Sequence, residues 1–298
     1  MLEARARLVN AIRGFFADRD FLEVNTPVRI PAPALEDYID AEPAGPGRWL
    51  RTSPELHLKR LLAAGYPRLF QLGPCFRRGE CGPRHQPEFT MLEWYRAEAN
   101  NRAILDDTVA LVRACAKAVG GTGTAGFRGI TADVDAPWEE LTVDEAFAKY
   151  AGTTPEAAMA GGEGGFEQTL VEKIEPHLGR GRPTVLKEYP PAFGALARRC
   201  PHRPGRADRW ELYVGGLELA NAYSELTDAA EQRQRFLACA ELRRRDGREV
   251  YPLDEEFLAA LETGLPPSGG IALGVDRLLM VLTGADTIQD TLPFPEPA

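Results

Sequence analysis

The sequence RLFQLGPCFRRGECGPRHQPEFTMLEWY, residues 68–95, predicts two strands joined by a polar loop. The strands cover residues 68–76 and 88–95 because these runs are rich in apolar and aromatic side chains. Successive side chains of the second strand point to opposite faces of a sheet. Four of them share one face, while Leu92 and Trp94 share the other; the four are Phe89, Met91, Glu93 and Tyr95.

The loop between these strands is cationic and carries Arg77, Arg78, Arg84 and His85. A guanidinium group pairs two oxygens at once, so a cluster of arginines suits a polyphosphate. The alternative is a solvated hairpin tip with surface charges. We favour the phosphate site because an aromatic ring, a carboxylate and a phenol stand in register behind the loop.

Residues 76–95 resemble motif 2 of the class II aminoacyl-tRNA synthetases in its lysine-specific form. They are similar in particular to the synthetase paralogues that attach (R)-β-lysine to elongation factor P. One departure is that Gly79 stands where the family has an acid, which here comes one position later, at Glu80. The resemblance implies that Arg77 holds the α-phosphate of ATP. It also implies a nucleotide site lined by four further residues of this motif, namely Glu80, His85, Gln86 and Phe89.

The composition is that of a soluble globular protein, with 298 residues, 44% hydrophobic, and a net charge of −9. No apolar run could span a bilayer and no secretory signal is present, so we expect a cytoplasmic protein with five reduced cysteines. Cys75 and Cys81 flank the loop, but no histidine partners stand at ligand spacing, which argues against zinc. The acidic balance favours a small-molecule or protein partner over tRNA.

Residues 2–18 predict an amphipathic helix, and the run FLEVNTPVRIPAP follows it at residues 21–33. The pair resembles motif 1 of the class II synthetases, which ends in a proline, here Pro27. The resemblance implies a homodimer formed through residues 2–30. Because the helix begins at the first residues, we expect one catalytic domain over residues 1–298 without an anticodon-binding barrel ahead of it.

A second helix is predicted to begin at Pro54, capped by Ser53 or Thr52. Glu55 lies in its first turn, where a carboxylate is favourable because of the helix dipole alone. The resemblance gives the Ser53-Pro54-Glu55 run another role, in which it contacts the amino-acid substrate and the glutamate meets an amine.

A hairpin is predicted in WELYVGGLELANAYSELTD, residues 210–228, with Gly215-Gly216 as its turn. Glu211 and Glu218 then share a face, and magnesium bound to ATP would neutralise them. The alternative is an exposed sheet face. The segment resembles the lysine-specific signature of the family, whose glutamates hold metal and whose later glutamate, here Glu225, enters the amino-acid pocket. A bulge near residues 221–224 must then reverse the alternation.

The run SGGIALGVDRLLMVLTGA, residues 268–285, predicts a glycine-containing strand that leads into a helix near Asp276. It resembles motif 3, whose arginine, here Arg277, stacks on adenine and reaches the γ-phosphate. Leu219 and Gly274 complete the nucleotide site that the resemblance implies. Ala272 stands where the β-lysine ligases have alanine and lysyl-tRNA synthetases tend to have glycine, which favours the β isomer.

The resemblance implies an α+β fold, with a mostly antiparallel sheet of six to seven strands flanked by helices. Residues 120–182 are expected to form a helical or loose insertion, with a loop over residues 120–129 and a capping box at Thr142 and Glu145.

The implied reaction is activation of lysine or β-lysine by ATP and Mg²⁺, with Arg77 and Arg277 as the catalytic pair. An acidic pocket of Glu55, Glu93, Glu225 and the Tyr95 hydroxyl suits a diamino acid. The first choice of acceptor is a lysine of elongation factor P. Two alternatives stay open: a synthetase-like enzyme that acts on tRNA or forms a free amide, and a non-catalytic regulatory module.

Overall fold

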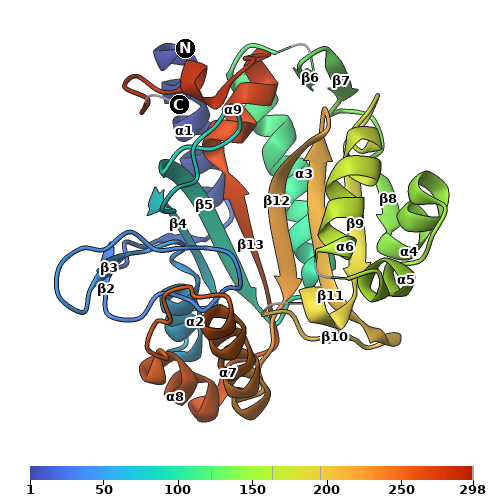
Figure 1. Cartoon of the computed structure of the whole chain (residues 1–298). Coiled ribbons are helices and arrows are strands. Elements are labelled where there is room, and N and C mark those ends of the chain that lie inside the picture. The colour runs from blue at the N-terminus through green and yellow to red at the C-terminus, as the bar shows by residue number, and fades with distance from the viewer. Residues whose placement is uncertain (122, 163, 195, 297–298) are drawn as a thin grey trace.

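The computed structural model describes residues 1–121, 123–162, 164–194 and 196–296. Its centre is a large sheet in the strand order β1-β4-β5-β13-β12-β11-β9-β8, with β10 paired to β11 (Figure 1). All neighbours are antiparallel except β1–β4 and β8–β9. The strands are β1 (Leu22–Glu23), β4 (Arg68–Phe76), β5 (Glu88–Ala97), β13 (Ser268–Gly274), β12 (Leu217–Ser224), β11 (Arg203–Val214), β9 (Thr184–Tyr189), β8 (Glu139–Thr142) and β10 (Arg199–Cys200).

The fold class is confirmed, and the described sheet is larger than expected. It has nine strands because two strands of two residues, β1 and β10, extend the seven longer ones. The predicted strands over residues 68–76 and 88–95 are both present, as β4 and β5. Strand β5 extends two residues beyond the prediction, to Ala97. Trp94 and Leu92 point into the main core, as the alternation predicted.

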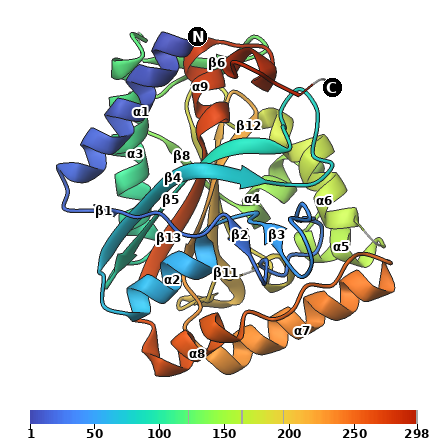
Figure 2. The same cartoon turned by 90° about the vertical axis from the view of Figure 1, so that its left-hand side faces the viewer.

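Helices α1 (Leu2–Ala17), α3 (Asn101–Ala118) and α9 (Val275–Thr283) pack against one face of the sheet (Figures 1 and 2). The buried side chains of α1 recur three or four positions apart, which is the stripe that a helix needs to cover a core. This core is apolar, and successive side chains of a strand alternate between the two faces, so the polar side chains of the strands lie on the opposite face.

The opposite face is partly closed by α2 (Glu55–Ala63), α7 (Ala229–Arg245) and α8 (Glu255–Gly264), which share a second core with Leu69 and Tyr95. The start of α2 corrects one expectation. Pro54 is the N-cap residue and not the first helical residue, and the Glu55 backbone amide donates a hydrogen bond to the Ser53 hydroxyl oxygen at 3.0 Å. The short β2 (Arg29–Ile30) and β3 (Trp49–Leu50) pair beside α2.

The segment 120–182 contains more strand than expected. A hairpin of β6 (Thr124–Phe127) and β7 (Ile130–Asp133) replaces most of the predicted loop, and β8 joins the main sheet. The predicted capping box is present at the start of this helical region, where Thr142 is the N-cap residue and Glu145 completes the box. These helical turns are α4 (Val143–Ala146), η1 (Phe147–Ala151), α5 (Pro155–Ala160), α6 (Gly165–Thr169), η2 (Leu170–Ile174) and η3 (Glu175–His177), and later in the chain η4 (Pro191–Phe193) and η5 (Ile288–Thr291).

The predicted hairpin is confirmed, and both turn glycines have positive φ. The bulge lies earlier than expected. Leu212 pairs with Ala220 and Tyr213 with Glu218, so Leu219 is the extra residue, whereas the pairing of residues 220–224 with β13 is regular. The bulge returns Asn221, Tyr223 and, by parity, Glu225 to the face that carries Glu218.

Candidate active site

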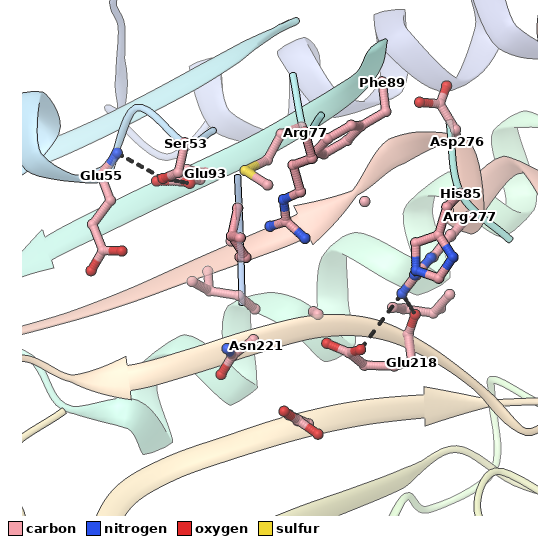
Figure 3. Close-up of a pocket in the computed structure, with 18 of the residues that line it drawn as sticks. Ser53, Glu55, Arg77, His85, Phe89, Glu93, Glu218, Asn221, Asp276 and Arg277 are labelled. Carbon is pink, nitrogen blue, oxygen red and sulfur yellow. Dashed lines mark hydrogen bonds and ion pairs between the residues drawn. The ribbon is translucent and has the colours of Figure 1, made fainter. Parts of the chain in front are cut away.

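A cavity of about 550 Å³ lies on the polar face of the sheet, where residues of β5, β13, β12 and β11 and of the loop between β4 and β5 line it (Figure 3). Every predicted site residue lines it except Pro54 and Glu225. The cavity has two chemically different ends. Ser53, Glu55 and Glu93 lie at one end, and His85, Glu218 and Arg277 at the other, with Arg77 between them.

Strand register explains why distant residues meet at the first end. Glu93 on β5 pairs with Ala272 on β13, which pairs with Asn221 on β12. In the next row, Tyr95 and Tyr223 flank Gly270. Paired residues share a face, so both rows point into the cavity.

Glu93 is the central carboxylate of the acidic end. It is 1% exposed and accepts hydrogen bonds from the Ser53 hydroxyl at 2.6 Å and the Tyr95 hydroxyl at 3.0 Å. Burial and the nearby Glu55 raise the pKa of Glu93, although both hydrogen bonds oppose this shift. A cationic group placed here would therefore be strongly favoured.

Glu225 was expected to enter the amino-acid pocket, but it is not among the residues that line the cavity and lies behind the cavity wall. It is 2% exposed, and its carboxylate lies 2.5 Å from the ammonium of Lys59. The same ammonium lies 2.5 Å from Glu55, one turn earlier on α2. Lys59 was missed because a Glu–Lys pair four residues apart is usually a surface pair, although its apolar neighbours Leu58 and Leu62 do indicate a buried face.

Arg77 offers an unused donor to a ligand. Its buried Nε has no hydrogen-bond partner in the part of the chain that the structure describes. The guanidinium lies 5.2 Å from the centre of the Phe89 ring and 3.8 Å from Glu80, so the displaced acid of the loop still faces the arginine. A buried, unsatisfied cationic donor in a cavity fits an anionic oxygen.

Arg277 is held at the other end by three acceptors. It donates to the carbonyls of Arg84 at 3.2 Å and Glu218 at 2.9 Å, and to His85 Nε2 at 2.6 Å. Burial and the nearby arginines lower the pKa of His85 to about 4, so the neutral ring can accept this bond. Arg277 and Arg84, together with the neutral His85, thus line this end of the cavity beside the start of β12.

The two carboxylates expected to hold magnesium differ in their surroundings. Glu211 already accepts bonds from Tyr189 at 2.5 Å, Tyr213 at 2.7 Å and Arg209. Glu218 keeps its carboxylate in the cavity, 3.6 Å from Arg277, and burial and Glu211 raise its pKa. The geometry therefore fits Glu218 as a cation ligand, whereas Glu211 would have to exchange one of its present partners.

Several lining residues were not predicted. Arg209 bridges Asn221 at 3.1 Å and Glu211, and Glu36 enters from the loop before β3. Asp276 is buried and ties the start of α9 to the Thr90 amide at 2.6 Å and to Arg5 at 2.5 Å. Asp276 directly precedes Arg277, but its partners Arg5 and Thr90 lie far away in the sequence, so the sequence alone did not reveal these contacts.

Comparison with known proteins agrees with this geometry. The tRNA synthetases class II (D, K and N) family matches residues 1–298, and the chain belongs to this family. It is 38% identical to the lysine–tRNA ligases of Moorella thermoacetica and Dehalococcoides mccartyi, and 36% identical to that of Thiobacillus denitrificans. Each alignment covers 98% of this chain but only 63–64% of the relative. The chain thus spans less than two thirds of the length of these relatives.

Proposed function

We propose that the protein activates a diamino acid, lysine or (R)-β-lysine, by ATP to form an aminoacyl-adenylate and pyrophosphate. The observation that carries this proposal is the cavity with an acidic end and a cationic end on the two sides of Arg77. The acidic end suits the ammonium groups of the substrate. The cationic end suits the phosphates of ATP.

In this reaction the substrate carboxylate attacks the α-phosphorus, a P–O bond forms, and the bond to pyrophosphate breaks. Positioning and charge stabilisation suffice, so no protein nucleophile is required. The unused Nε of Arg77 would donate to the α-phosphate or to the attacking carboxylate. Arg277, with Arg84 and His85, would hold the leaving pyrophosphate, and Phe89 would lie against the adenine.

Magnesium would be held by Glu218 together with phosphate oxygens, since this ion prefers such ligands. Bound there, it would neutralise charge on the phosphates. Glu211 would keep its hydrogen bonds with Tyr189, Tyr213 and Arg209 and so hold these side chains in place beside the magnesium site.

The position of Ala272 supports (R)-β-lysine as the substrate. Its methyl group stands between Glu93 and Asn221 on the cavity floor, where it changes the space near the substrate amine. We expect the wild type to form adenylate faster with (R)-β-lysine and Ala272→Gly to shift the preference toward α-lysine. Equal preference in both proteins would refute this choice of isomer.

For the acceptor we propose a lysine side chain of elongation factor P. The resemblance of motif 2 and the net charge of −9 support a protein acceptor. The second candidate is tRNA, because the relatives are named lysine–tRNA ligases.

Dimerisation through residues 2–30 and a cytoplasmic location stay predictions. No helix in the described residues is long and apolar enough to cross a membrane.

One experiment separates these acceptors. The protein is incubated with ATP, Mg²⁺ and labelled lysine or (R)-β-lysine, together with either purified elongation factor P or bulk tRNA. A mass gain on intact elongation factor P of one amino-acyl residue, without labelled tRNA, is the expected result. Label on tRNA alone would support the second candidate, and adenylate without transfer to either would reject both. Absence of any ATP–pyrophosphate exchange would favour a non-catalytic module.

A further inference from the structure

Lys59 is a fully buried cation for which the proposed reaction gives no role. It is 1% exposed and lies on α2 with Leu58 and Leu62, which are also buried. A lysine is rarely buried unless an opposite charge compensates the loss of water. Here two carboxylates compensate it, those of Glu55 and Glu225, each 2.5 Å away.

The two carboxylates come from different sides of the site. Glu55 lines the cavity, whereas Glu225 follows the end of β12 and lies beyond the wall. The wall between them is tightly packed, since a Cβ at Gly270 would lie 2.2 Å from the Tyr95 ring and 2.3 Å from Glu225. Lys59 therefore connects a cavity residue to a carboxylate fixed in the protein interior.

A charge count indicates what this connection does. The three carboxylates around Lys59 and Ser53 (Glu55, Glu93 and Glu225), taken with the one ammonium, leave two negative charges when all are ionised. Glu36 also lines the cavity, but burial favours its uncharged form. Two negative charges match the two ammonium groups of a diamino acid, while its carboxylate is matched by Arg77. An amino acid with one ammonium would leave one buried charge without a partner.

We propose that Lys59 is a positioning residue that fixes Glu55 and sets the charge of the acidic end, so that the site selects substrates with two ammonium groups. This inference rests on the proposed activation of a diamino acid. Lys59 would act through Glu55 and would not touch the reacting atoms.

The test uses Lys59→Ala, because the atoms that it removes correspond to propylammonium. ATP–pyrophosphate exchange is measured with lysine and (R)-β-lysine, with and without added propylammonium. We expect KM for the amino acid to rise about tenfold or more while KM for ATP stays unchanged, since charge-assisted bonds to Glu55 are lost. Added propylammonium should restore the lower KM, whereas propan-1-ol and tert-butylammonium should not.

Two controls keep the result interpretable. Lys187→Met removes a partly exposed lysine paired with Glu140, outside the cavity, and should leave KM unchanged. In the double variant Lys59→Met/Glu225→Gln, loss of the ammonium is balanced by loss of one carboxylate. If Lys59→Ala does not fold, the double variant is compared with the single variant Lys59→Met. The proposal predicts that KM for the amino acid is closer to the wild-type value in the double variant than in Lys59→Met.

The proposal is overturned if folded Lys59→Ala keeps the wild-type KM, or if neither propylammonium nor the double variant restores it. Failure of the proposed function looks different, since the wild type itself would then show no exchange. In that case the melting temperature of Lys59→Ala decides: propylammonium should raise it and should leave the wild type unchanged, and no rise would overturn the anchoring role.

Discussion

At the scale of single residues, the site depends on cationic donors that point into the cavity. Arg77 has a buried donor without a partner, whereas each donor of Arg277 named above already has an acceptor. We expect Arg77→Ala to reduce kcat of adenylate formation by about 100-fold or more, because it removes charge stabilisation of the transition state. Arg78→Ala is the control, since Arg78 does not line the cavity. Equal effects of the two substitutions, measured by pyrophosphate exchange, would contradict the role of Arg77.

Glu93 gives a pH dependence with a defined sign. Burial and Glu55 raise its pKa, so near neutral pH part of the free protein carries a protonated Glu93. A substrate ammonium favours the ionised form, so its binding should release protons and tighten as pH rises from about 6 to about 8. Calorimetry in two buffers of different ionisation enthalpy measures the release. Affinity that weakens over this range would contradict the assignment.

At the scale of elements, the most constrained position is Gly270, between Tyr95 and Tyr223. A Cβ there would overlap both the Tyr95 ring and Glu225. We expect Gly270→Ala to lower the free energy of unfolding by about 1–3 kcal/mol and to raise KM for the amino acid. Gly205→Ala on β11 is the matched control, because a Cβ there meets no atom within 4 Å. Denaturant unfolding of both variants tests this, and equal stabilities would show that the wall is not rigid.

The elements also show what sequence could and could not predict. The strand over residues 88–95 and the Gly215-Gly216 turn depend on local alternation and turn chemistry, and both were predicted. The bulge at Leu219 was placed two to five residues too late, because its position depends on pairing between strands. The Lys59–Glu225 pair was missed for the same kind of reason, since helix α2 and the end of β12 meet only in the folded chain.

At the scale of the whole molecule, the acidic cavity makes stability depend on pH. Burial raises the pKa of Glu36 from 4.5 to about 7, and Glu93, Glu218 and Glu225 shift in the same direction. The folded protein therefore holds protons that the unfolded chain has released above about pH 4.5. This stabilising contribution is fully present below about pH 4.5 and is lost as pH rises through about 7.

We expect the free energy of unfolding to fall between about pH 5 and pH 8, with Glu36 contributing on the order of 3 kcal/mol. Glu36→Gln should make the profile flatter, because the amide has no proton to lose. Denaturant unfolding at several pH values measures both. Stability that rises over this interval would contradict the raised pKa of these carboxylates.

The central claim is that one cavity joins an acidic end for two ammonium groups to a cationic end for a triphosphate. ATP–pyrophosphate exchange with lysine, (R)-β-lysine and norleucine tests it most directly, because norleucine lacks the terminal amine. The account predicts exchange with one or both diamino acids and a loss of about 100-fold or more in kcat/KM with norleucine. Comparable exchange with norleucine, or exchange with none of the three, would contradict it.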